Sequence, residues 1–199
     1  MNRKEKRIIY ADNAATTRLD QDAFEAMCPF LCENFGNASQ PYSFSRVPKN
    51  ALKIARETIA SCINASPEEI FFTSGGTESD NWALKGILKT NESQTVITSQ
   101  IEHHAILHTC ASIEQVGNKV IYLPVDRNGI VDTNTLQEAL VNKVALVSVM
   151  YANNEIGSLE PIHELCNIAH RNGAKFHTDA VQAVGHVKID VKEIGVDMM

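Results

Sequence analysis

A repeated alternation of short apolar runs and amphipathic segments constrains the fold of this 199-residue chain more than any other feature. Apolar runs with strand character predict β-strands at residues 70–73, 95–98, 119–123, 144–150 and 175–177, with the start of another at 196–199. Helical periodicity predicts helices at residues 77–89, 103–116, 133–141, 161–172 and 180–184. Strands that alternate with helices are joined by right-handed crossovers, so we expect an α/β fold whose mostly parallel sheet has helices on both faces.

The first part of the chain lacks this alternation. Helices are predicted at residues 21–35 and 48–63, with a loop rich in Gly, Asn and Ser at 36–43 between them. Residues 8–10 are expected to form a short strand or an extended arm. We therefore expect an N-terminal arm over residues 1–15 and an α/β domain over residues 16–199.

Composition excludes several classes of protein. Apolar residues make up 44% of the chain, which is typical of a globular protein, and the formal net charge is −6. No basic face stands out, so nucleic acid is not an expected partner. No apolar run has the length of a signal-peptide core or a membrane span, so the expected location is the cytoplasm, with no membrane partner. The five cysteines are scattered, so they predict neither a disulfide framework nor a metal site, but buried apolar positions.

Polar residues of unusual type follow four of the predicted strands. Gly75 to Thr77 follow the strand at 70–73, and His103 and His104 follow the strand at 95–98. Asn154 follows the strand at 144–150, and Asp179 and Gln182 follow the strand at 175–177. Ligands of parallel sheets bind at the carboxyl ends of the strands, so these four groups predict one binding site at one edge of the sheet.

The turn at residues 74–77 has the character of a phosphate site. An apolar run leads through two glycines into Thr77 and Glu78, and a helix is predicted to begin there. Such a turn points free backbone N–H groups toward an anion, and the helix dipole favours negative charge at that end. Neither G-x-G-x-x-G nor a P-loop lysine is present. An ordinary strand-to-helix turn with a good cap is the alternative interpretation.

The other polar residues suit a phosphorylated heteroaromatic cofactor. Asp179 could pair with a protonated ring nitrogen, although it could instead cap a following turn. His103 or His104 could stack on the ring or transfer protons, or either could cap a helix. Asn154 and Gln182 could donate amide hydrogens to a ring oxygen, or could simply close turns.

Five ordered stretches resemble the cysteine desulfurases of the NifS/IscS type, which are pyridoxal-phosphate enzymes of the class V aminotransferase group. They lie at residues 10–17, 72–81, 102–105, 153–157 and 177–185 and include Ser-Gly-Gly-Thr-Glu-Ser-Asp-Asn at 74–81 and Asn-Asn-Glu-Ile-Gly at 153–157. The resemblance covers nearly the whole chain. It implies that residues 16–199 form part of the large domain of a type I aminotransferase-like fold.

The resemblance also implies individual roles. Gly76 and Thr77 would bind the cofactor phosphate through a backbone N–H and a hydroxyl. His103 would stack on the pyridine ring and assist proton transfer, which makes it the expected catalytic residue. No metal site is implied.

The remaining implied roles concern the edge of the ring. Asp179 would pair with the ring nitrogen, and Gln182 would donate a hydrogen bond to the phenolate oxygen. Asn154 would lie beside that oxygen, near the substrate carboxylate.

The implied reaction converts L-cysteine into L-alanine and transfers sulfur through a protein persulfide. The implied partners are a second copy of the chain in a homodimer and a sulfur acceptor, such as an iron–sulfur scaffold or a tRNA-thiolation enzyme. Another class V enzyme (a selenocysteine lyase or an aminotransferase) is an alternative, as is a non-catalytic binding or assembly module of the same half-fold.

Two departures from the family pattern are expected to matter. The loop that usually reads Gly-Asn-Pro-Ser-Ser-x-His is here residues 36–42 and lacks that Pro and His. The Schiff-base lysine of a Ser-x-x-His-Lys stretch is expected just beyond residue 199, since none of Lys85, Lys119, Lys175 and Lys188 has that context. The persulfide cysteine has no match either. The sequence therefore predicts a large domain truncated before completion, without a C-terminal small domain and inactive by itself.

Overall fold

The computed structural model describes residues 8–89, 92–140 and 143–199. Positions 1–7, which hold part of the predicted arm, lie outside the described residues, as does position 141 at the end of one predicted helix. The chain divides into two compact units, Met1–Ile54 and Ala55–Met199.

The first unit contains helix α1 (Gln21–Cys32), the 3-10 turn Ser43–Ser45 and the beginning of α2 (Arg46–Ile63). Helix α1 begins after Asp20, whose carboxylate accepts the N–H groups of the next turn. It ends three residues before the predicted boundary at residue 35, because the N–H groups of residues 33 and 34 both bond to the carbonyl of Pro29.

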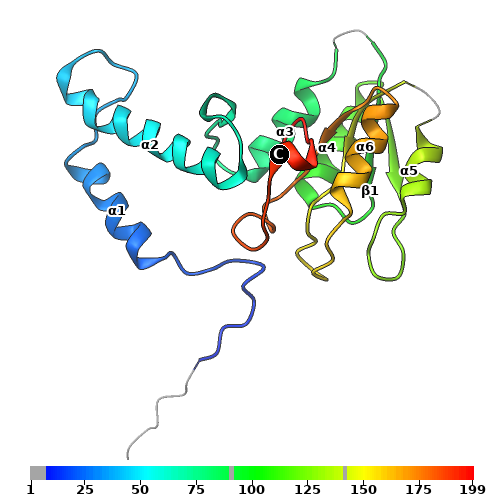
Figure 1. Ribbon diagram of the computed structural model, residues 1–199, viewed down its shortest axis with the longest axis horizontal. Coiled ribbons are helices and arrows are strands. Elements are labelled where there is room, and N and C mark those ends of the chain that lie inside the picture. Colours follow the sequence, from blue (N-terminus) through cyan, green and yellow to red (C-terminus); the bar gives the residue numbers. More distant parts are fainter. Residues whose placement is uncertain (1–7, 90–91, 141–142) are drawn as a thin grey trace, which may run out of the picture. The chain divides into compact units, whose positions relative to one another are not determined.

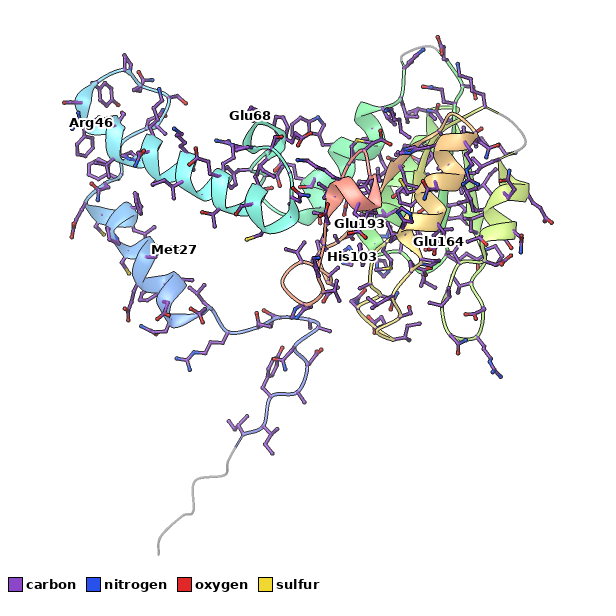
Figure 2. All side chains as sticks on the ribbon, viewed as in Figure 1. Met27, Arg46, Glu68, His103, Glu164 and Glu193 are labelled. Atoms are coloured by element: carbon purple, nitrogen blue, oxygen red, sulfur yellow. The ribbon has the colours of Figure 1, made fainter. Side chains whose placement is uncertain are left out.

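Helix α1 carries an apolar stripe, as its sequence predicts, but the stripe is not buried. No residue of α1 is buried, and Met27, in the middle of the stripe, is 48% exposed (Figure 2). The periodicity of a helix is therefore a correct guide to its existence but not to its burial within this chain.

A four-stranded parallel sheet forms the centre of the second unit (Figure 1). Its strands are β1 (Thr95–Ser99), β2 (Lys119–Leu123), β3 (Val144–Ser148) and β4 (Lys175–His177), in the order β2-β1-β3-β4. All neighbouring pairs are parallel. The predicted strands at 95–98, 119–123, 144–150 and 175–177 and the predicted parallel arrangement are confirmed.

Helices cover both faces of the sheet, which is the predicted architecture. They are α3 (Gly76–Gly86), α4 (His104–Gln115), α5 (Thr133–Ala139) and α6 (Ile162–Arg171). Val96 and Leu146 pack in a buried cluster with residues of α3 and α4. The next residues along the strands, Ile97 and Val147, pack with residues of α5 and α6. This alternation follows from the period of two along a strand.

The predicted strand at residues 70–73 is wrong. The segment is extended, but it joins no ladder among the described residues, and Phe71 is 65% exposed. The carbonyl of Ile70 instead accepts a hydrogen bond of 2.9 Å from Nε of Arg56. An apolar run becomes a strand only when a neighbouring strand pairs with its backbone, and no described residue pairs with this run.

The predicted helix at residues 180–184 is also wrong. The segment folds as consecutive turns, in which Ala183 and Val184 both donate to the carbonyl of Ala180. Gly185 follows with a φ of 82°, a left-handed conformation that ends helical geometry at once. A helix that was not predicted, α7 (Val191–Ile194), begins after Asp190, whose carboxylate accepts two N–H groups of its first turn.

The last residues lie along β4, in agreement with the strand predicted to begin at 196–199. Met198 forms a single parallel bridge with His177. Asp197 accepts hydrogen bonds from Nζ of Lys175 at 2.6 Å, Nε2 of His170 at 2.7 Å and the N–H of Phe176 at 2.8 Å. These three bonds attach the end of the chain to β4 and α6.

None of the helices within residues 8–89, 92–140 and 143–199 combines the length and the apolar character needed to cross a membrane. Within those ranges, no group of three or more His, Cys, Asp and Glu side chains could hold a metal ion.

Candidate functional site

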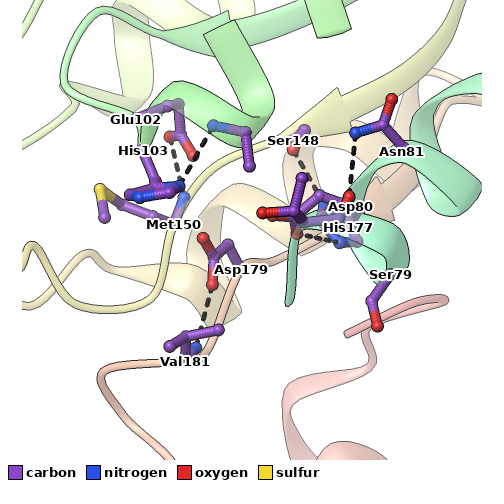
Figure 3. A network of polar contacts seen from close by, with 12 residues as sticks. Ser79, Asp80, Asn81, Glu102, His103, Ser148, Met150, His177, Asp179 and Val181 are labelled. Carbon is purple, nitrogen blue, oxygen red and sulfur yellow. Dashed lines mark hydrogen bonds and ion pairs between the residues drawn. The ribbon is translucent and has the colours of Figure 1, made fainter. Parts of the chain in front are cut away.

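The residues predicted to bind a cofactor lie in four turns of the second unit. His103 follows β1, Asn154 follows β3 and Asp179 follows β4, so all three leave the sheet at its carboxyl edge. The fourth turn leads into α3 and contains Gly76 and Thr77. Figure 3 shows polar contacts near these turns, with Asp179 between Glu102 on one side and Asp80 on the other.

The turn before α3 lies beside the turn after β4. A Cβ atom placed on Gly76 would lie only 3.0 Å from Cγ2 of Val181. The side chain of Thr77 follows Gly76 directly, and Gln182 follows Val181. The close approach brings the turn that holds the predicted phosphate residues beside the turn that holds Asp179 and Gln182, and the small size of glycine permits it.

The N-terminus of α3 is suited to an anion. A helix leaves its first N–H groups without acceptors inside the helix, and its dipole adds partial positive charge there. The backbone N–H of Ser74 is satisfied by Oε2 of Glu78 at 2.6 Å, which closes the turn locally. The role of Gly76 and Thr77 as a phosphate site stays a prediction.

Asp179 is a buried carboxylate with a fixed orientation. It is 7% exposed, and its Oδ1 accepts the N–H of Val181 at 3.0 Å. Its backbone carbonyl accepts the N–H of Tyr151 at 2.8 Å, which ties the turn to the segment after β3. The bond from Val181 is the capping bond that was the alternative role of Asp179. This bond also fixes the orientation of the carboxylate.

His103 is the N-cap of α4. Its Nδ1 accepts the N–H of Ala105 at 3.1 Å, which leaves the proton of a neutral imidazole on Nε2. The ring is exposed at the edge of the sheet. Capping and ring stacking are therefore compatible in this one residue. His104 lies in the first turn of α4, where its ring contacts His108 at a centroid distance of 5.3 Å.

Asn154 and Gln182 are both half-buried at the same edge. Nδ2 of Asn154 donates to Oε1 of Glu155 at 3.2 Å, so its amide is presented beside an exposed carboxylate. Neither residue is placed by the structure against a ring oxygen, and their roles stay predictions.

Several buried titratable groups near Asp179 were not predicted from the sequence. Burial raises the pKa of Glu102 to about 8. Burial, together with the carboxylate of Asp179, raises the pKa of Asp80 to about 7. Burial lowers the pKa of His177 to about 4, and its Nδ1 lies 2.9 Å from Oγ of Ser148.

These pKa values have one electrostatic consequence. Near neutral pH Glu102 and His177 are both uncharged, and Asp80 is partly protonated. The site thus limits the negative charge around Asp179, although four of its acidic and basic groups are buried together. Perturbed titratable groups gathered in this way are a mark of functional sites.

Two lysines lie at the opposite edge of the sheet. Lys119 and Lys175 are the first residues of β2 and β4, whereas His103 and Asp179 follow the carboxyl ends of their strands. Lys175 is also engaged with Asp197. Neither lysine is placed to act in the site.

Comparison with known proteins gives the family. Residues 9–199 match the protein family Aminotransferase class-V. The chain belongs to this family. A cysteine desulfurase IscS of Methanosarcina thermophila is 50% identical over 197 residues, which is 98% of this chain and 49% of that protein. Another cysteine desulfurase IscS, of Clostridium botulinum strain Kyoto, is 51% identical over 193 residues, or 96% of this chain and 49% of that protein.

Solved structures share the fold of this chain. A NifS-like protein superposes with a TM-score of 0.90 and 37% identity, over 94% of this chain and 52% of that chain. A structure described as SspA in complex with cysteine superposes with a TM-score of 0.93 and 36% identity, over 95% of this chain and 55% of that one. The class V chain described here spans about half the length of the curated relatives it matches. The predicted resemblance and the predicted fold class are confirmed.

The residues present fit pyridoxal phosphate, the cofactor implied by the family. The phosphate would meet the N-terminus of α3, where Gly76 leaves room that a larger residue would fill against Val181. A protonated ring nitrogen would meet Asp179. Of the two buried carboxyl groups that interact with Asp179, Glu102 is mostly protonated near neutral pH and Asp80 is partly protonated.

Proposed function

We propose that this chain provides the cofactor-binding part of a cysteine desulfurase, an enzyme that converts L-cysteine into L-alanine and transfers the sulfur through a protein persulfide. The proposal is supported by sequence identities of 50% and 51% to two cysteine desulfurases over almost the whole chain. It is also supported by the approach of Gly76 to Val181, which joins the phosphate turn to the Asp179 turn.

Each chain residue has a role in this proposal. Gly76 and Thr77 bind the phosphate, and Asp179 holds the proton of the ring nitrogen. Bound in this way, pyridoxal phosphate supplies an electron sink for chemistry at the substrate α-carbon. His103 covers the ring and moves a proton through its exposed Nε2. Gln182 donates an amide hydrogen to the phenolate oxygen of the ring, and Asn154 lies beside that oxygen, near the substrate carboxylate.

The proposal extends to partners. The substrate is L-cysteine, and one of the similar solved structures is described as SspA in complex with cysteine. The whole enzyme acts as a homodimer in the cytoplasm and passes sulfur to an acceptor such as an iron–sulfur scaffold protein.

The nucleophilic cysteine of that reaction is not expected among the buried thiols described here. Sγ of Cys166 lies 3.8 Å from Nδ1 of His170, but burial raises the pKa of the Cys166 thiol to about 11. A thiol that stays protonated at neutral pH is a poor nucleophile. Cys32 and Cys62, which were predicted to be buried, are exposed instead, and Cys28 is intermediate. None of the three has a neighbouring base in the described hydrogen bonds.

A direct experiment mixes this 199-residue chain with pyridoxal phosphate and L-cysteine and follows cofactor binding, sulfide and alanine. We expect saturable cofactor binding without turnover, because none of the chain's lysines has the sequence context of a Schiff-base lysine. Absence of any binding would refute the proposed cofactor role. Sustained formation of sulfide and alanine would refute the proposed need for a lysine outside these residues.

A further inference from the structure

Two turns at the carboxyl edge of the sheet carry residues of the proposed site. Residues 99–104 carry His103, and residues 150–157 carry Asn154. The two turns come from different strands and are about 50 residues apart in the sequence. Two hydrogen bonds from buried side chains connect them directly.

The first bond comes from Glu102. Its Oε1 accepts the N–H of Met150 at 2.9 Å and the hydroxyl of Ser99 at 2.6 Å. One carboxylate oxygen thus joins the end of β1 to the second residue after β3. Glu102 immediately precedes His103, so this bond lies one residue from the imidazole (Figure 3).

The second bond comes from Asn153. Its Nδ2 donates to the carbonyl of Ile101 at 2.9 Å, in the opposite direction across the same gap. Its Oδ1 accepts the N–H groups of Glu155 and Ile156 at 2.8 and 3.0 Å, which fixes the turn around Asn154. Asn153 immediately precedes Asn154, as Glu102 precedes His103.

Both side chains are buried, and other groups cover them. The charged and titratable groups that face Glu102 are Asp179, Glu160 and Cys110. Its Oε2 has no hydrogen-bond partner among the described residues. Oε2 of Glu102 therefore has no hydrogen-bond donor, and the neighbouring Asp179 and Glu160 are acidic. Both conditions favour the protonated form of Glu102, which agrees with its raised pKa.

We propose that Glu102 and Asn153 are positioning residues, which form a two-bond clasp that sets the distance between His103 and Asn154. This inference rests on the proposed function, because the distance matters only if both residues face the same cofactor. The clasp acts through geometry: it needs an acceptor at Oε1 of Glu102 and a donor at Nδ2 of Asn153, and no charge on either.

Substitutions can separate position from charge. Glu102→Gln keeps the acceptor oxygen and replaces the acid hydroxyl with an amide, so the clasp should survive. Glu102→Ala and Asn153→Ala each remove one bond across the gap. Glu164→Gln is the matched control, because Glu164 is an exposed glutamate of α6.

The first measurement needs no cofactor. Side-chain NMR signals of His103 and Asn154 in the 199-residue chain should shift in both alanine variants and stay unchanged in Glu102→Gln and Glu164→Gln. The second measurement is the dissociation constant for pyridoxal phosphate. The dissociation constant should rise about tenfold in each alanine variant, because one buried hydrogen bond is lost and its partner is left unsatisfied. In Glu102→Gln it should stay within about twofold of the value for the unsubstituted chain.

The outcomes distinguish this inference from the proposed function. Cofactor binding that is absent in every variant, with NMR shifts as expected, refutes the function but supports the clasp. Signals of His103 and Asn154 that do not respond to either alanine variant overturn the clasp, and so does a Glu102→Gln variant as impaired as Glu102→Ala. Circular dichroism shows whether each variant is folded. If an alanine variant is unfolded, Glu102→Asp replaces Glu102→Ala and Asn153→Ser replaces Asn153→Ala, because both shorten the side chain without emptying the site.

Discussion

Nε2 of His177 lies 3.8 Å from Oδ1 of Asp80, and the two side chains are 2% and 5% exposed. This distance is within the range of an ion pair, but the two groups do not carry opposite charges. Burial lowers the pKa of His177 to about 4 and raises the pKa of Asp80 to about 7. Between these values both groups are neutral, so the pair is a polar contact under the proposed site and not a salt bridge.

Removal of the Asp80 charge is expected to change the pH dependence of stability. The folded-state pKa of Asp80 is above its ordinary value of 3.8, so ionisation opposes folding. The free energy of unfolding should therefore fall as pH rises from about 4 to about 7. Asp80→Asn should remove this loss. The difference in free energy of unfolding between the variant and the unsubstituted chain should therefore be on the order of 1–3 kcal/mol more favourable to the variant at pH 8 than at pH 5. Urea unfolding at both pH values measures the difference, and equal pH dependence in the two proteins would contradict the assignment.

Ser148→Ala should destabilise the second unit. The substitution leaves Nδ1 of His177, 2.9 Å from Oγ of Ser148, without its partner in a buried place. The expected cost is about 1–3 kcal/mol in the free energy of unfolding. Ser61→Ala is the control, because Ser61 is exposed and bonds only to the carbonyl of Thr58 in its own helix. Similar stability of the two variants would show that the Ser148–His177 bond is unimportant.

Phe176→Ala tests the core of the sheet. Phe176 is fully buried in β4 within the cluster that packs against α5 and α6. Loss of the ring should cost about 3–5 kcal/mol, through lost burial and the cavity left behind. Phe71→Ala removes the same ring from an exposed segment, where the cost should stay below about 1 kcal/mol. Thermal denaturation of both variants gives the comparison, and equal losses would argue against the described core.

Asp197→Asn tests the attachment of the last residues. Three donors converge on Asp197, and the hydrogen bond from Lys175 is the largest of the effects that lower its pKa below 3.8. A lowered pKa means that the ionised form supports folding above pH 4 and that this support is lost as pH falls below it. The variant should lose about 1 kcal/mol at pH 7, a modest figure because the group is partly solvated, and should be less sensitive to acid. Amide hydrogen exchange of Met198 should quicken at the same time, and protection equal to the unsubstituted chain would count against the attachment.

The strands of the sheet were predictable because their apolar runs are bounded by turn residues and separated by helical periods. The run at 70–73 has the same local character, yet it is not a strand. Pairing depends on which segments lie beside it, and local sequence does not encode that. The turns at 180–184 fail for a related reason, since Gly185 ends the helical geometry that Ala180 to Val184 would permit.

The positions of two candidate residues follow directly from the strand pattern, whereas their roles stay predictions. His103 and Asp179 follow strands in the sequence and in the structure, but Gly76 begins α3 after an extended run that is not a strand. Asp80, Glu102 and His177 were missed as titratable groups, because their pKa shifts arise from burial between elements distant in the sequence. The only available signal was their position inside the same motifs, next to residues already chosen.

The central claim is that the Gly76–Thr77 turn and the Asp179 turn form one site for pyridoxal phosphate. Equilibrium dialysis of the cofactor against the unsubstituted chain, Thr77→Val, Asp179→Asn and the control Lys119→Ala tests it most directly. We expect one saturable site, at least about tenfold weaker in Thr77→Val and in Asp179→Asn and unchanged in Lys119→Ala. Binding that ignores both site substitutions, or that never saturates in the unsubstituted chain, would contradict the claim.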